Sequence, residues 1–337
     1  DLEDILESNE ETKDVDIDKV SDIYESIYNS SDENINSLRS ILYSASFHEN
    51  DLDKNEDIQT AVLIKYLNEI HTQTPYAFSS ELSRKSAEMF RDIVTDNSFV
   101  PNYKKWLITG GLTHEDSGTN DKYYGKTSYD FDVIDAESRL TGAYVIGKYG
   151  YSDTMTFGAV AGGNKGETEL STNSKIKGNI GYAGGFVEKY SGNMTLKAGA
   201  GIQYSEYDGE RKTIDNNYSD KYSDTAYDLY GSIKYSLPLE NNFFLEPYGI
   251  FSYTHIDQDG ASEENKPLAI ETDDKKFDYV NLRTGVDLKK IIPAEKIKHI
   301  LSFGVSYNRI LDGSKEENIT GKMKNSTSDF NILVARK

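Results

Sequence analysis

The sequence predicts an all-β fold: a transmembrane, up-and-down antiparallel β-barrel preceded by a helical N-terminal segment. Three observations lead to this prediction: long stretches of two-residue alternation, short turns that alternate with long polar loops, and an abundance of tyrosine. The chain has 337 residues, of which 25 are tyrosines, and its mean hydropathy is −0.64. Barrel strands alternate apolar and polar positions, so such a chain is polar on average although one face contacts lipid.

The clearest alternation runs from Tyr227 to Leu239, where odd positions are mostly apolar and even positions are polar. Successive side chains of a strand point to opposite sides, so this pattern predicts a half-buried strand. A turn at 240–242 follows, and the alternation resumes from Phe243 to Tyr253. Both strands exceed the usual five or six residues of soluble proteins. Such a hairpin is typical of an outer-membrane barrel, and a soluble sandwich hairpin is the alternative.

Composition restricts the possible partners and compartments. No long apolar run is present, which argues against transmembrane helices. The net charge of −20 argues against a nucleic-acid partner. The absence of cysteine fits a chain that crosses an oxidising compartment. The chain starts at Asp1 with neither Met nor a signal-peptide pattern, so we expect a piece of a longer precursor.

Residues 1–73 are acidic and helical in pattern. Residues 1–60 alone hold eighteen Asp and Glu against four Lys and Arg. Three apolar stripes predict helices, separated by polar clusters at 30–34 and 50–57. This pattern predicts a small helical bundle or a partly disordered stub, without a functional site. The stripes are Val20, Ile23 and Ile27; Ile35, Leu38, Ile41 and Leu42; and Ile58, Val62, Tyr66, Leu67 and Ile70.

A single longer helix is predicted from Thr74 to Thr95. Thr74 is a suitable cap, Pro75 suits the first helical position, and the polar residues at 96–98 end the helix. Twenty helical residues span about 30 Å, which is about the hydrocarbon thickness of a bilayer. Its candidate functional residues form a dense polar face: Glu81, Arg84, Lys85, Glu88 and Arg91.

From Tyr103 onwards the pattern is that of strands. We expect the apolar face of each strand to contact lipid and the polar face to enclose a wet lumen. Polar residues expected on the inner face are Lys197, Gln203, Lys234, Glu246 and Arg283. The apolar faces include Trp106, Ile108 and Leu112; Met155, Phe157, Ala159 and Ala161; Ile176, Ile180, Tyr182 and Phe186; Met194 to Tyr204; Val280 to Leu288; Leu301 to Tyr307; and Phe330, Ile332 and Val334.

Short and long connections alternate, as expected when one end of a barrel faces the periplasm and the other the outside. This alternation favours one crossing at Leu140–Tyr151, with residues 123–137 projecting above the membrane, and gives ten crossings. The last crossing is the strand around Phe330. Short turns are expected at 152–153, 191–193, 240–242 and near 293, and long polar loops at 115–124, 164–174, 208–223, 257–275 and 312–326.

In this order the parts resemble the C-terminal translocator domain of classical monomeric autotransporters, the type V secretion family. The resemblance covers about residues 74–337 and rests on the order of short motifs. After the acidic segment and the single helix come a Trp-initiated strand and a long glycine-bearing strand. The matching segments are Lys105–Gly111, Leu140–Asp153, the Leu-Glu-Pro-aromatic segment Phe244–Tyr248 and the Arg-x-Gly-like segment Arg283–Val286.

The resemblance implies a twelve-stranded barrel in a Gram-negative outer membrane, with the helix threaded through its pore. Residues 1–73 would be a passenger remnant or linker, 74–100 the pore helix with its connection, and 101–337 the barrel without its last hairpin. About twelve strands leave room for one helix of about 10–12 Å. The inner polar residues are then expected to meet the polar face of the helix. The implied partners are outer-membrane lipid, the chain's own passenger and the barrel assembly machinery.

No pattern in the sequence predicts chemistry, so we expect neither an enzyme nor a cofactor or metal site. The five histidines lack metal-ligand spacing, and Gly199-Ala200-Gly201 lacks the helix start of a dinucleotide loop. Those glycines are expected to relieve crowding in the barrel wall. Some members of the resembled family cut themselves at an Asn-Asn pair, which the helix here lacks, so no catalytic residue is assigned.

The predicted function is that of an outer-membrane translocator. It would anchor its N-terminal passenger and allow its export to the cell surface, while the helix plugs the barrel. The first alternative is a porin or adhesin barrel that acts through its long extracellular loops. The second is a soluble β-rich binding protein.

Overall fold

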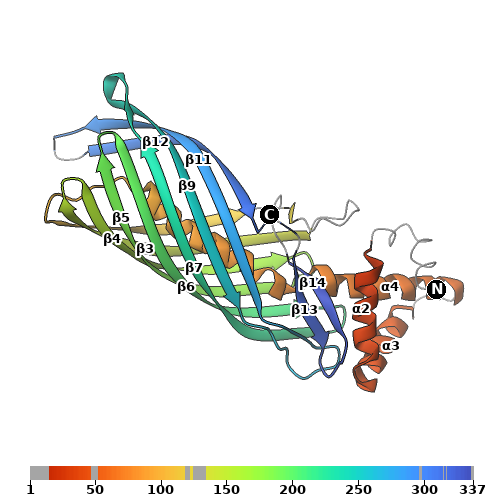
Figure 1. Cartoon of the computed structure of the whole chain (residues 1–337). Coiled ribbons are helices and arrows are strands. Elements are labelled where there is room, and N and C mark those ends of the chain that lie inside the picture. The colour runs from red at the N-terminus through yellow and green to blue at the C-terminus, as the bar shows by residue number, and fades with distance from the viewer. Residues whose placement is uncertain are drawn as a thin grey trace.

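The computed structural model describes residues 15–46, 52–117, 122–123, 134–295, 298–313, 315 and 317–334. Figure 1 shows a long curled sheet with one helix inside it and a group of helices at one end. Predictions that concern residues 1–14, 124–133 and 335–337 lie outside the described residues. Among the described helices, none combines the length and apolar character needed to cross a bilayer.

Nine long strands in the described residues form the curled sheet, all antiparallel and in chain order. Strict chain order is the up-and-down arrangement predicted from sequence. The two outermost strands, β1 and β12, each keep one unpaired edge within the described part of the chain. The strands are β1 (Trp106–Ser117), β3 (Ile134–Ser152), β4 (Met155–Leu170), β5 (Lys175–Ser191), β6 (Met194–Lys212), β7 (Asn217–Tyr235), β9 (Phe243–Gln258), β11 (Lys275–Pro293) and β12 (Lys298–Asp312). Two short strands lie off this path: β2 (Lys122–Tyr123) pairs with β3, and β8 (Leu237–Pro238) pairs with β9. The 3₁₀ turn η2 (Glu240–Asn242) connects β8 to β9.

The connections differ from the prediction at one end of the sheet only. The short turns at 152–154, 191–193, 236–242 and after Pro293 occur where they were expected. Most residues of the long polar loops predicted at 164–174 and 208–223 instead belong to strands. The pairing of β4 with β5, and that of β6 with β7, continues until about four residues are left to form each turn. We call the two ends of the sheet the short-turn end and the loop end.

The tenth predicted crossing does not join the large sheet. The strand around Phe330 forms as β14 (Asp329–Leu333), but it pairs with β13 (Asn318–Met323), which pairs with β10 (Ile270–Thr272). This three-stranded loop sheet lies at the loop end, beside the N-terminal helices (Figure 1). Ile332, Leu333 and Val334 are consecutive and all buried. Such a run suits a segment that is covered on both faces and does not suit a lipid-facing strand.

The N-terminal segment forms three helices, α2 (Ile17–Tyr28), α3 (Asp32–Ser46) and α4 (Leu52–Thr72). Helix α4 includes most of the polar cluster predicted to be a break at 50–57. The predicted helix from Thr74 is divided: a 3₁₀ turn η1 (Pro75–Ala77) precedes α5 (Ser79–Asp96). Thr74 does not cap this turn with its side chain, because its hydroxyl donates to the carbonyl oxygen of Ile70 at 2.6 Å.

Most strands direct their apolar face outward, as predicted. Exposed fractions of 88% for Leu112 and 54% for Leu229 place these side chains on the outer surface. Strand β5 is the exception, because its Ile176, Ile180 and Tyr182 are buried inside. The outer face of β5 instead carries mainly small side chains and glycine between Gly181 and Gly185. Alternation alone does not say which face of a strand is outside, and here the larger apolar residues pack against the lumen contents.

The lumen and its helix as the candidate functional site

Helix α5 lies inside the curled sheet (Figure 1). Many of the residues that it buries there are small. Ser79, Ser80, Ser83, Ser86 and Ala87 are all fully buried. Small residues allow a helix backbone to approach a sheet closely. The wall strand β6 uses this approach: the Gln203 side-chain nitrogen donates to the carbonyl oxygen of Ser83 at 2.9 Å. The hydroxyl of Ser83 in turn donates to Asp224 of β7 at 3.1 Å.

Four of the five polar helix residues predicted as functional lie close together on α5. Arg84 bridges Glu81 and Glu88, with nitrogen–oxygen distances of 2.9 and 3.0 Å. Its guanidinium also lies over the ring of Tyr279 in β11. Glu88 accepts a hydrogen bond from Asn308 of β12 at 2.8 Å. Lys85 is buried on the same helix.

The fifth residue, Arg91, makes a buried ion pair with the wall. Its Nη1 lies 2.8 Å from Asp228 Oδ1, and both side chains are almost completely excluded from solvent. Thr254 of β9 donates to the same oxygen at 2.7 Å. Burial of two charges is costly, and the pair is tolerated because the charges are in contact and further hydrogen-bonded. Asp228 stands on the polar face predicted for β7, so its inward direction, but not its partner, was visible in the sequence.

The inner polar residues expected to meet the helix divide into two groups. Lys197, Gln203 and Arg283 contact α5, and Arg283 pairs with Asp92 at 2.7 Å. Lys234 and Glu246 instead pair with neighbours in the wall, with no ion pair to α5. Lys234 lies 3.1 Å from Asp287 and Glu246 lies 2.7 Å from Lys289. The contacts depend on how the strands are aligned with one another, and alternation within one strand does not report that alignment.

Two lysines hold the C-terminal end of α5 at the short-turn end. The Lys197 ammonium donates to the carbonyl oxygens of Val94, Thr95 and Asn97 at 3.0, 3.1 and 2.6 Å. A helix leaves its last carbonyls unpaired and carries partial negative charge there, so an ammonium is a favourable cap. Lys148 donates to the carbonyl of Phe99 at 2.8 Å. A cavity of about 250 Å³ adjoins this end of α5 and is lined in part by Asp96 and Tyr248.

Glu188 joins the two lysines, and sequence analysis missed it. Its Oε1 lies 2.7 Å from Lys148 Nζ and 3.4 Å from Lys197 Nζ, and Glu188 and Lys148 are each 1% exposed. Glu188 lies on the same face of β5 as Ile176 and Tyr182, which alternation assigned to lipid. The signal that could have found it is an acid on that otherwise apolar face, opposite Lys197 in the β5–β6 register.

The outer surface changes from apolar to charged along the strands. One row of directly paired residues across β3 to β7 is wholly apolar: Val145, Ala161, Ala183, Ile202 and Tyr227. Nearer the loop end, the outward row across β1 to β7 alternates in sign: Asp116, Arg139, Glu167, Lys177, Asp208 and Lys221. Hydrocarbon tolerates the first row and not the second, so the strands project beyond the membrane at the loop end.

A curled antiparallel sheet with an apolar exterior, and a polar interior that encloses one helix, is the arrangement the resemblance implied. The sequence model of the autotransporter β-domain family matches residues 116–336. The chain belongs to this family. The translocator domain of autotransporter NalP from Neisseria meningitidis has the same fold, with 13% identity, a TM-score of 0.58, and coverage of 74% of this chain and 86% of that one.

A second similar structure is the β-domain of the Bordetella autotransporter BrkA, at 11% identity and a TM-score of 0.41 over 65% of this chain and 85% of that chain. No curated protein sequence matches the chain. Membership of the autotransporter β-domain family makes the chain an outer-membrane β-barrel translocator. The described residues contain no cluster of side chains suited to a metal ion.

Proposed function

We propose that the loop end of this autotransporter β-domain faces the cell exterior, and that the passenger leaves the barrel there. The direction of α5 carries the proposal. Ser79, at its N-terminal end, donates to Gln258 near the loop end at 2.9 Å, while Lys197 near the short-turn end holds its C-terminal end. The chain therefore enters the lumen from the loop end, and short turns face the periplasm in such barrels.

The segments follow from this orientation. Residues 1–73 belong to the passenger side, 74–100 occupy and leave the lumen, and 101–337 supply the wall and the loop sheet at its mouth. Glu81, Arg84, Lys85, Glu88 and Arg91 serve as structural residues that hold the plug in place. No step of this mechanism requires bond chemistry, so the proposed function is transport and anchoring without catalysis. The inserted barrel depends on the barrel assembly machinery, because unpaired strand edges are costly in lipid.

Accessibility of two epitope tags on intact cells tests the orientation. One tag is fused before Asp1, and the matched tag is inserted in the β5–β6 turn at Asn193. We expect antibody and protease to reach the first tag on intact cells, and the second only after the outer membrane is permeabilised. The reverse pattern contradicts the proposal. Depletion of the assembly machinery is expected to lower both signals together.

A further inference from the structure

The loop end of the lumen is covered by a second element besides α5. Helices α2 to α4 and the loop sheet β10–β13–β14 are joined there by polar contacts between distant parts of the chain. Ser26 donates to the carbonyl of Ser328 at 2.7 Å and accepts from the Met323 amide at 3.0 Å. Asn34 accepts from the Leu268 amide at 2.8 Å. We call α2–α4 together with this sheet the mouth cap.

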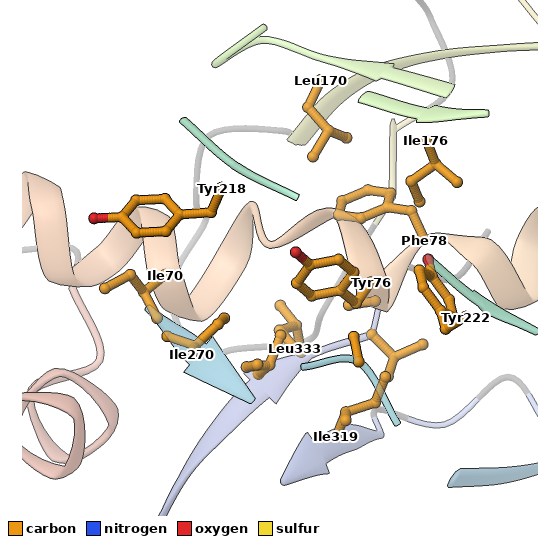
Figure 2. Close-up of a cluster of buried hydrophobic side chains, with 14 of the residues drawn as sticks. Ile70, Tyr76, Phe78, Leu170, Ile176, Tyr218, Tyr222, Ile270, Ile319 and Leu333 are labelled. Carbon is orange, nitrogen blue, oxygen red and sulfur yellow. The ribbon is translucent and has the colours of Figure 1, made fainter. Parts of the chain in front are cut away.

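One continuous apolar cluster runs from the mouth cap into the lumen. It joins Ile27 and Leu67 of the helices to Ile270 and Ile332 of the loop sheet, and continues to Leu82 of α5. Figure 2 shows Tyr76 and Phe78 in the middle of this cluster, between the helices, the loop sheet and the barrel strands that carry Leu170 and Ile176. Close-packed apolar side chains leave few voids larger than a water molecule, so such a cluster is a barrier to solutes.

A buried ion pair ties this cluster to the barrel wall. Arg211 of β6 binds Glu263 through two nitrogens, at 2.7 and 2.8 Å, and Glu263 is completely buried. Tyr76 donates to Glu263 at 2.9 Å, and the Ile270 amide donates to its other oxygen at 2.8 Å. This bidentate arrangement satisfies the carboxylate and fixes its geometry. The segment before α5 and the loop before β11 are thereby attached to the same wall position.

We propose that the mouth cap is a second closure of the pore, which blocks solutes at the outer mouth even when α5 is loosened. The two closures differ in chemistry. The C-terminal half of α5 is held by ion pairs beside a cavity, whereas the mouth is filled by close-packed apolar side chains. Acting in series, either closure alone keeps the barrel shut. The N-terminal helices thus act on the pore and are not only a linker to the passenger.

Conductance of the purified whole protein, with the barrel closed between β1 and β12, tests this proposal in planar bilayers with two changes and their combination. Ile27→Asp places a charge in the buried cluster and undocks the cap, and Tyr28→Asp is the matched control, since Ile27 is 1% and Tyr28 66% exposed. Arg91→Ala with Asp92→Ala loosens α5. Each change alone is expected to leave conductance near that of the unmodified protein. Together they are expected to raise it at least about tenfold.

A reversible cross-link makes the test independent of folding. Asn29 and Ser328 lie side by side on the surface, with Nδ2 and Oγ 2.8 Å apart, and the chain has no cysteine. Asn29→Cys with Ser328→Cys, added to the doubly loosened protein, is expected to close the pore on oxidation and reopen it on reduction. High conductance from the α5 change alone, low conductance from the combination, or indifference to the cross-link would each overturn the proposal.

Discussion

At the scale of single residues, the lumen is held by charges whose partners are already in place. Arg91 and Asp228 are the most deeply buried pair between α5 and the wall. Removing one member leaves the other charge without its counter-charge in a site from which water is excluded. A broken buried pair costs about 3–5 kcal/mol, whereas an exposed pair contributes about 0–1 kcal/mol.

Arg91→Ala is therefore expected to lower the free energy of unfolding by about 3–5 kcal/mol, measured by urea titration of the protein refolded in detergent. The matched control is Arg139→Ala, whose partner Asp116 is 3.7 Å away on the exposed outer surface. The double change Arg91→Met with Asp228→Leu should recover most of the loss, because it removes both charges. Equal effects of Arg91→Ala and Arg139→Ala would contradict this account.

The glycines of β6 were expected to relieve crowding, and the structure confirms this. A Cβ at Gly201 would overlap the Tyr182 hydroxyl, and one at Gly199 would overlap the ring of Tyr230. Tyr182 is itself stacked on Phe90 of α5, with centroids 4.8 Å apart. Gly201 thus provides the space in which the ring of Tyr182 stacks on Phe90 of the helix.

Gly201→Ala is expected to destabilise the barrel by about 1–3 kcal/mol, the usual cost of overpacking. Heat-modifiable mobility in gel electrophoresis reports the loss as a lower transition temperature. Gly249→Ala is the control, since nothing lies within 4 Å of its added Cβ, and its effect should stay within about 0.5 kcal/mol. An unchanged transition in Gly201→Ala would show that Tyr182 can move aside freely.

At the scale of elements, one histidine makes the docking of α4 depend on pH. The His71 Nδ1 atom lies 2.7 Å from the carbonyl oxygen of Asn331 in β14. Burial lowers the pKa of His71 below its ordinary value, more than this carbonyl and the charges of Asp16 and Asp22 raise it, and Lys19 lowers it further. The unfolded segment then binds the proton more tightly. Docking is complete above about pH 6.5 and weakens as the pH falls towards the folded-state pKa.

Protease release of α2–α4 from protein in vesicles should accordingly be faster at about pH 5.5 than at about pH 7.5. His71→Gln removes the titrating ring, keeps a side-chain donor for the Asn331 carbonyl, and should abolish most of this difference. A variant that keeps the full pH dependence would assign it to other groups.

The elements that sequence patterns predicted well are those with one large apolar face and one polar face. Strands β6 and β7 have strict alternation, and Leu229 lies outside as expected. The face of β5 was predicted wrongly, because its outer face carries small residues and its larger apolar residues lie on the inner face. Asp228 is visible in the sequence as an inward acid, whereas Glu188 lies on the face of β5 that alternation assigned to lipid. The partners of these two acids depend on the register between strands and on the position of α5 along the lumen, which no single strand encodes.

The mouth cap lay beyond sequence patterns for a different reason. Its contacts join residues around 26–71 to residues around 268–334, and each hydrogen bond closes a very long stretch of chain. The apolar stripe at Phe330, Ile332 and Val334 predicted a strand correctly. The strand's neighbours decided that it joined the loop sheet and not the barrel.

At the scale of the whole molecule, the direction of the strands limits how the barrel can close. Strands β1 and β12 both run from the short-turn end to the loop end, since successive strands in the nine-stranded path alternate in direction. A direct pair between them would be parallel. Antiparallel closure needs an odd number of strands between them, and three give the twelve strands expected for the whole barrel. Closure removes the unpaired edges that hydrocarbon cannot satisfy.

The position of the membrane along the strands predicts different free-energy costs for charges placed on the outer face of β7. Leu229 and Ser219 both point outward from β7, but only Leu229 lies among the apolar rows, beside Tyr253 of β9. An arginine at the bilayer midplane costs about 2–4 kcal/mol, and one near the interface about 0–1 kcal/mol. Leu229→Arg should therefore reduce folding into lipid vesicles by that larger amount, while Ser219→Arg changes it little. In detergent micelles, which adapt their shape around a charge, the difference between the two variants should shrink. Equal losses for both variants in vesicles would mean that the lipid-contacting surface extends to the loop end, and the assigned position of the membrane would be wrong.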